Sequence, residues 1–146
     1  MSAKTIKSAL GLLQDDPDSR DAWQTLRHDV ESDPGMSPDE LASLLEAARR
    51  VYEGRREYDA VRKVLEIELV AARNSARERG LMAELARVLD EELMDDVGAC
   101  AAYERLLAHD PNDADASDAL ERTNAKRAKW RNLLDRYVQE AQGAGD

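Results

Sequence analysis

Apolar residues return at steps of three and four along almost the whole chain, which is the spacing of one face of an α-helix. The first stripe of this kind contains Ile6, Leu10 and Leu13. Short connections between successive helices favour antiparallel neighbours, and hence helical hairpins that lie side by side. The pattern predicts about eight helices, at residues 3–14, 19–32, 38–53, 58–72, 76–93, 97–107, 113–123 and 126–141.

Polar residues and glycines mark where these helices begin and end. Ser19 is available as the N-cap of the second helix, and Ser37-Pro38-x-Glu40 combines an N-cap, a first-turn proline and the acid of a capping box. Gly54 predicts the end of the third helix, and Gly80 marks a break within the fifth. Residues 33–36 form the one clear irregular loop.

One sequence phrase occurs twice and indicates an internal repeat. Leu-Leu-x-x-Asp-Pro, followed by Ala and Leu at fixed spacing, is found at residues 12–26 and again at 106–120. A second, weaker similarity relates residues 58–69 to 130–141. The two offsets, 94 and 72 residues, are not multiples of one period. The chain is therefore predicted to be an irregular array of helical hairpins.

The C-terminal copy of the phrase resembles the tetratricopeptide repeat (TPR). Ala99-x-x-x-Tyr103-x-x-Leu106-x-x-x-x-Pro111 is similar to the second helix of that repeat, where a small residue lets helices approach, a ring fills the gap and a proline ends the run. Residues 96–141 as a whole resemble the long degenerate repeat arrays of large bacterial proteins.

The N-terminal copy is similar to the family at Trp23-x-x-Leu26, where the next first helix has its Trp and Leu. Arg27 and Glu121 depart from the family pattern, because a small residue is expected at that helix crossing. Ser117 stands where the last unit would have Trp. A half-a-TPR family or a plain α-α hairpin array would give almost the same pattern.

The resemblance implies an all-α fold, a TPR-like right-handed α-solenoid of about four stacked antiparallel hairpins. Residues 1–146 would form a single domain, or the N-terminal part of a longer array. In such a superhelix the first helix of each hairpin lines the concave side, which is the default surface for a protein partner.

Composition narrows the choice of partner and compartment. Charged residues make up 36% of the chain and the net charge is −10, so the phosphate backbone of a nucleic acid is a poor partner. No segment approaches the roughly 20 apolar residues that a membrane span needs, so membrane insertion is not expected. The single cysteine, Cys100, cannot form an internal disulfide, which agrees with a cytoplasmic location.

The usual catalytic and metal-binding patterns are missing from the sequence. His28 and His109 form no Glu-x-x-His or His-x-x-x-His pair, and no glycine-rich phosphate loop is present. Cys100 lies on an inward stripe without an identifiable base, and the acidic runs lack the form of a calcium loop. We therefore expect no catalytic, cofactor or metal site, and no enzyme.

Arginines are the candidate partner-binding residues. Arg is well suited to the bidentate binding of carboxylates, so an acidic peptide segment is the predicted ligand. For the arginines around the Gly54 turn, ion pairs within the chain are an equally good explanation. The first group gathers around the Gly54 turn, and the second is predicted to form a ladder on the polar faces of first helices: Arg49, Arg50, Arg55 and Arg56, and Arg27, Arg50 and Arg87.

These features favour a non-catalytic scaffold or adaptor that binds a partner protein along its concave face. The alternative is a self-assembly module of a larger bacterial complex, in which end helices carrying Trp130 and Tyr137, or Ile6 and Leu10, pair between chains. An enzyme built from arginines and carboxylates comes third. The segment from Trp130 to Tyr137 is as apolar as an internal helix, so either something covers it or the array continues.

Overall fold

The computed structural model describes residues 2–144, and this part of the chain contains helices and no strand. The predicted all-α class is thereby confirmed. Seven α-helices are present, with one π-helical segment (η1) directly after α5. They are α1 (Ser2–Asp15), α2 (Arg20–Ser32), α3 (Pro38–Arg55), α4 (Tyr58–Ala71), α5 (Glu78–Arg87), η1 (Val88–Glu92), α6 (Asp96–His109) and α7 (Ala114–Ala144).

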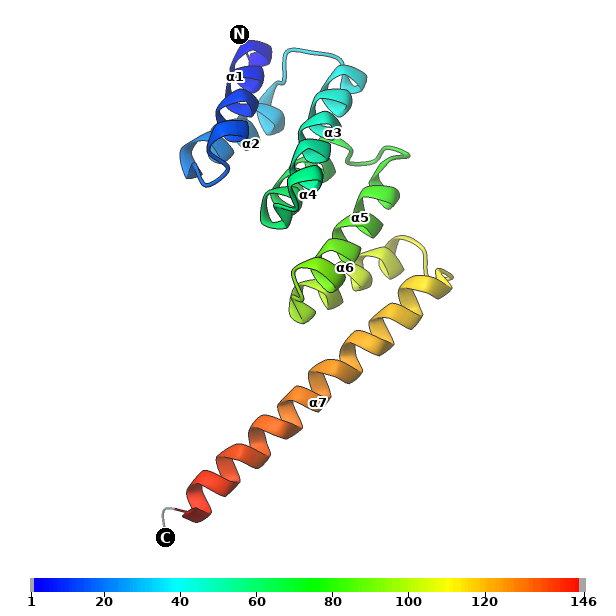
Figure 1. Ribbon diagram of the computed structural model, residues 1–146. Helices are drawn as coiled ribbons and strands as arrows, with labels where there is room; N and C mark the ends of the chain where they lie inside the picture. Colours follow the sequence, from blue (N-terminus) through cyan, green and yellow to red (C-terminus); the bar gives the residue numbers. More distant parts are fainter. Residues whose placement is uncertain (1, 145–146) are drawn as a thin grey trace.

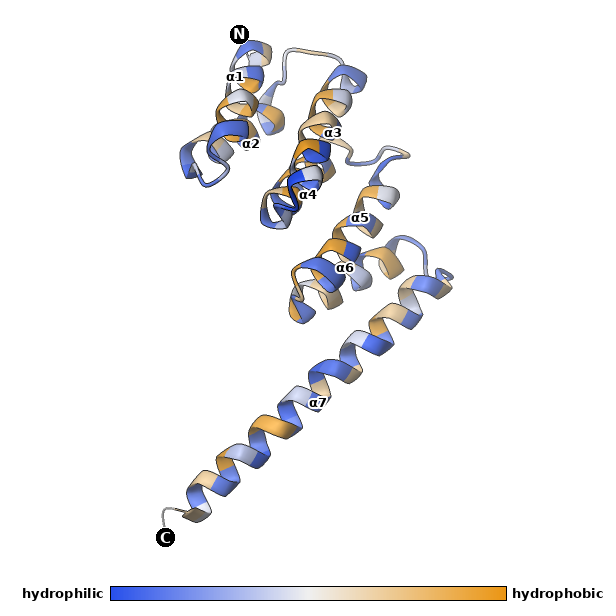
Figure 2. Cartoon of the chain, in the orientation of Figure 1, coloured by the Kyte–Doolittle hydropathy of each residue, from blue (hydrophilic) through white to orange (hydrophobic). Residues whose placement is uncertain are grey.

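Successive helices pack in pairs, α1 with α2, α3 with α4, and α5 with α6 (Figure 1). Contacts of α4 with α2 and with α5 join the three pairs. The first part of α7 packs against α6, and the rest of the helix extends away from the pairs (Figure 1). Each of the paired helices carries buried apolar residues. Along α7, apolar residues continue into the part that has no neighbouring helix (Figure 2).

The buried apolar residues form one connected cluster that runs from Ile6 in α1 to Ala119 in α7. Helix α4 lies in the middle of this cluster, and its Val61, Val64 and Leu65 are fully buried. A helix with contacts on several sides needs a wide apolar face, which the sequence of α4 supplies. The pairs are therefore held together by a continuous core.

Two predicted helix starts are confirmed. The hydroxyl of Ser19 accepts a hydrogen bond of 3.3 Å from the backbone N–H of Ala22, and the hydroxyl of Ser37 accepts one of 3.2 Å from that of Glu40. Pro38 occupies the first turn of α3, where its missing N–H costs nothing. These caps satisfy backbone donors that have no partner within the helix.

The predicted end of the third helix at Gly54 is wrong by two residues. Helix α3 continues through Gly54, and Arg56 takes the left-handed conformation with φ of 58°. The backbone N–H groups of Arg56 and Glu57 donate to the carbonyl oxygens of Glu53 and Tyr52, which closes the helix end. Because this hydrogen-bond pattern satisfies the last carbonyls, a non-glycine residue is tolerated at the left-handed position.

The break predicted near Gly80 is also absent, since α5 passes through that residue. The predicted segment 76–93 is instead divided at Val88, where α5 gives way to η1. The backbone N–H of Leu93 donates to the carbonyl of Val88 at 2.9 Å, five residues earlier, as in a π-helix.

The two last helices, predicted at 113–123 and 126–141, are one continuous helix, α7. The intervening residues Asn124 and Ala125 include neither a glycine nor a proline, so nothing in the local sequence ends the helix. This fusion accounts for seven α-helices where about eight were predicted.

Candidate functional site

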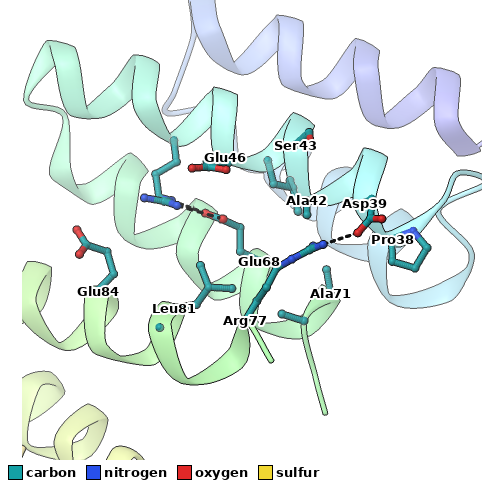
Figure 3. Close-up of a pocket in the computed structure, with 14 residues that line it drawn as sticks. Pro38, Asp39, Ala42, Ser43, Glu46, Glu68, Ala71, Arg77, Leu81 and Glu84 are labelled. Carbon is teal, nitrogen blue, oxygen red and sulfur yellow. Dashed lines mark hydrogen bonds and ion pairs between the residues drawn. The ribbon is translucent and has the colours of Figure 1, made fainter. Parts of the chain in front are cut away.

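A cleft of about 620 Å³ opens between α3, the end of α4 and α5 (Figure 3). We call it the α3–α5 cleft. Small and apolar side chains form part of its lining, among them Ala42, Ala72 and Leu81. The complete lining consists of Pro38, Asp39, Ala42, Ser43, Leu45, Glu46, Arg49, Glu68, Ala71, Ala72, Arg77, Gly80, Leu81 and Glu84.

A buried ion pair lies at the inner side of this cleft. Arg49 Nε is 2.6 Å from Glu68 Oε1, and Arg49 Nη1 is 3.0 Å from Glu53 Oε1. Burial raises the pKa of Glu68, and the hydrogen bond from Arg49 opposes this shift. Burial also lowers the pKa of Arg49, but its two carboxylate partners outweigh that effect and raise it. The Arg49 guanidinium and the Glu68 carboxylate are therefore held together as a fixed part of the cleft lining.

A second ion pair crosses one end of the cleft, from Arg77 at the start of α5 to Asp39 in the first turn of α3 (Figure 3). Glu46 is paired with Arg50 and Glu84 with Arg87, so the carboxylates along the cleft already have basic partners. The cleft thus offers small and apolar side chains between charges that neutralise one another.

The arginines predicted as a ladder lie on three helices, and each is paired with an acid of its own helix or of η1 directly after it. Arg27 lies on α2, which is the second helix of its pair, whereas the prediction placed it on a first helix. The hydrogen bond to Glu84 is the main cause that raises the pKa of Arg87. The closest pairs are Arg27–Glu31 at 2.9 Å, Arg50–Glu46 at 2.8 Å and Arg87–Glu84 at 2.6 Å.

Of the predicted group around Gly54, Arg49, Arg50 and Arg55 each contact another residue of the chain through their side chains. Arg55 Nη1 donates to the carbonyl oxygen of Gln14 at 2.7 Å, which ties the end of α3 to the end of α1. Arg56 caps α3 through its backbone. Only Arg49 of this group lines the α3–α5 cleft.

Arg27 and two arginines that were not predicted line a hollow of about 440 Å³ on α2, α4, α5 and α6. We call it the arginine hollow. Arg27 lines it together with Arg73 and Arg105, around the apolar side chains of Leu69 and Leu85. Two carboxylates also line it, Glu66, which is paired with Arg62, and Glu78, which accepts a hydrogen bond from the backbone N–H of Asn74. Arg73 and Arg105 were not among the predicted residues, because they are distant in sequence from Arg27 and share no motif with it.

Cys100 is almost fully buried, and its Sγ donates to Asn124 Oδ1 at 3.3 Å. Its predicted inward position is confirmed. Among residues 2–144 no group of three His, Cys, Asp or Glu side chains could hold a metal ion. Within the same range no helix is long and apolar enough to cross a membrane.

Comparison of the chain with known protein families, curated proteins and solved structures found no match.

Proposed function

We propose that this protein is a non-catalytic interaction scaffold, a TPR-like right-handed array of helical hairpins that binds a partner protein in the α3–α5 cleft. The cleft itself is the observation that supports the proposal, because it lies between α3 and α5, the first helices of two successive pairs. First helices are the ones that line the inner face of such arrays.

The lining of the cleft favours an apolar segment of the partner. Ala42, Ala71 and Leu81 offer contact surface without polar groups that would need new hydrogen bonds. The charged side chains beside them are paired within the chain, so a partner is not required to neutralise them. An amphipathic helix or an extended segment with two or three apolar anchors fits this chemistry.

The experiment compares capture of partner proteins from the native host by the wild-type chain and by two tryptophan variants. Ala42→Trp fills the cleft, while Ala101→Trp adds the same side chain at an exposed position of α6. We expect a partner that is retained by Ala101→Trp and lost with Ala42→Trp. Capture of no protein by the wild type would contradict the scaffold function, and equal capture by all three would place the partner on another surface.

If the partner carries the acidic segment predicted from the sequence, the arginine hollow is the surface best suited to bind it. Among the described residues, Arg73 and Arg105 have no ion pair, whereas the arginines of the predicted ladder all have one. Two unpaired guanidinium groups beside apolar side chains suit a carboxylate-bearing segment. Arg73→Glu with Arg105→Glu should abolish capture of an acidic partner. Lys4→Glu with Arg20→Glu, an equal change of charge at exposed positions elsewhere, should leave it intact, and equal loss in both would indicate long-range electrostatics alone.

A further inference from the structure

The residues of α7 from 126 to 144, here called the distal half of α7, carry an exposed apolar face. Trp130, Leu134, Tyr137 and Val138 expose 61%, 62%, 59% and 54% of their surface. A soluble helix with such a face usually packs it against another element. Figure 1 shows that this part of α7 extends beyond the other helices, so no described segment of the chain covers it.

This face continues the face that α7 packs against α6. Ala116 and Thr123 are buried in the first half of α7, and Trp130 and Tyr137 follow at further steps of seven residues. Positions seven apart lie on the same side of a helix, two turns from each other. The packed stripe therefore runs on past the end of the surface that α6 provides, and a second helix would extend that surface.

Contacts near residues 122–126 fix the direction in which the distal half of α7 leaves the other helices. Asp90 of η1 accepts a hydrogen bond of 2.9 Å from the hydroxyl of Tyr103 in α6. Arg122 and Lys126 of α7 lie 3.5 Å and 3.7 Å from the same carboxylate. Because these contacts join η1, α6 and α7, the exposed face leaves the body in a defined direction and is available to a partner.

We propose that the distal half of α7 pairs, antiparallel, with the distal half of α7 of a second copy of this chain. A two-fold contact requires a face that is complementary to itself. When two such helices cross at Leu134, Trp130 of each copy lies at the level of Tyr137 and Val138 of the other, so large rings meet apolar side chains on both sides.

The area is sufficient for a small stable interface. Each aromatic side chain buries at least about 150 Å² when fully covered, so the four rings of a dimer account for roughly 600 Å². Leu134 and Val138 of both copies, with the stems of the flanking basic side chains, bring the total toward the roughly 1,200 Å² at the lower end of specific interfaces.

Charge decides the direction of the pairing. The first turns of the distal half contain Lys126, Arg127, Lys129 and Arg131, whereas residues 137–144 contain Glu140 and no basic residue. A parallel pair would set eight positive charges at one level, which is unfavourable. The antiparallel pair places each basic stretch opposite the end that carries Glu140.

The body next to Trp130 is also shaped for this contact. Met94 there is 79% exposed. It lines a hollow together with three acidic residues and three residues of α7: Asp90, Glu91 and Asp96, and Arg122, Lys126 and Trp130. In the antiparallel pair the Tyr137 end of the second copy arrives beside this hollow. Met94 then gains an apolar neighbour.

The first test is the molar mass in solution, measured by sedimentation equilibrium over a wide range of concentration. The wild type is expected to be a dimer that dissociates on dilution. Leu134→Glu should raise the dissociation constant at least about a hundredfold, because both copies lose an apolar contact and bring carboxylates together. Asn132→Glu, the matched control on the opposite side of the helix, should stay dimeric, and circular dichroism should show equal helix content in all three.

The second test measures direction by spin labels at Ala128→Cys in a Cys100→Ser background. In the antiparallel pair the two labels are separated by about 18 Å along the axis, the rise of twelve residues, whereas a parallel pair would bring them to about 10 Å. A monomer at every concentration, or equal mass for Leu134→Glu and Asn132→Glu, would overturn the pairing. A short label distance would overturn its direction. None of these outcomes depends on the α3–α5 cleft.

Discussion

Arg49 and Arg50 are neighbours in the sequence, but they differ in what their side chains do. The Arg49 side chain is 13% exposed and paired with Glu68, which is 6% exposed. The Arg50 side chain is 68% exposed and paired with Glu46 one turn away on the same helix. Removing one partner of a buried pair leaves an uncompensated charge, while a surface pair contributes little.

We therefore predict that Arg49→Ala lowers the free energy of unfolding by about 3 kcal/mol, and that Arg50→Ala lowers it by less than about 1 kcal/mol. Urea unfolding followed by circular dichroism measures both. A double change, Arg49→Met with Glu68→Leu, removes both charges and should recover most of the loss. Equal effects of the two single changes would show that Glu68 is solvated in the folded chain.

Asp113 provides a pH dependence at the start of α7. The backbone N–H of Ala116 donates to Asp113 Oδ1 at 3.1 Å, and Arg79 lies 3.2 Å from Oδ2. The hydrogen bond from Ala116, followed by that from Arg79, lowers the pKa of the Asp113 carboxyl. A carboxylate with a lowered folded-state pKa stabilises the fold above the unfolded pKa, near pH 4, and loses this contribution as the pH falls through the folded value.

Asp113→Asn keeps a capping side chain and removes the charge. It should be less stable than the wild type at pH 7, and the difference should shrink as the pH falls below about 4. Thermal unfolding at several pH values measures this. Asp118→Asn, at an exposed position of the same helix, is the control and should follow the wild type throughout. A constant difference for Asp113→Asn would mean that the charge has no part in the cap.

How far the arginine contacts could be predicted from the sequence depends on the distance between the partners along the chain. The pairs of Arg27 with Glu31 and of Arg50 with Glu46 follow from their four-residue spacing on a helix. The pair of Arg49 with Glu68 spans nineteen residues and depends on how α3 and α4 pack, which periodicity does not fix. For the same reason the sequence could not show that Arg27, Arg73 and Arg105 line one hollow.

At the scale of elements, the sequence predicted correctly that these segments are α-helices and where most of them begin. Apolar stripes and N-caps involve residues that are close together in the sequence, so the local sequence is enough to find them. Two predicted helix ends were wrong: one was placed at a glycine that does not end its helix, and the other at a turn for which the sequence has no signal. Helix α3 ends at a left-handed arginine, Arg56, where a glycine was expected. Helix α7 continues where a turn was expected by analogy with a hairpin, although no helix-breaking residue is present between 123 and 126.

The continuity of α7 can be measured directly. Spin labels at Ser117→Cys and Gln139→Cys, in a Cys100→Ser background, should lie about 33 Å apart in a single helix, since 22 residues rise by 1.5 Å each. A hairpin that turned near residue 125 would bring them to about 15 Å. The measurement is made on the monomeric Leu134→Glu variant, so that labels on two copies do not contribute. A short distance would restore the two predicted helices.

At the scale of the whole molecule, α7 divides into a part that belongs to the core and a part that does not. The buried residues of α7 are Ala116, Ala119 and Thr123, and they pack in the first half of the helix. The distal half adds exposed apolar surface and no buried residue of the body. The core cluster from Ile6 to Ala119 therefore does not need residues beyond Ala128.

A chain shortened to residues 1–128 should thus unfold at low concentration with the same free energy as the full chain, within about 0.5 kcal/mol. Pairing through α7 makes the stability depend on concentration. A dimer that forms only between folded chains is favoured at higher concentration, so the thermal midpoint of unfolding rises with concentration. The midpoint should therefore rise with concentration for residues 1–146 and stay constant for residues 1–128. A chain shortened to residues 1–113 is the control that must lose stability, since it uncovers the face of α6 that α7 packs against. If residues 1–128 were destabilised at every concentration, the distal half of α7 would have to fold back onto its own body, and the exposed face would not be free for a second copy.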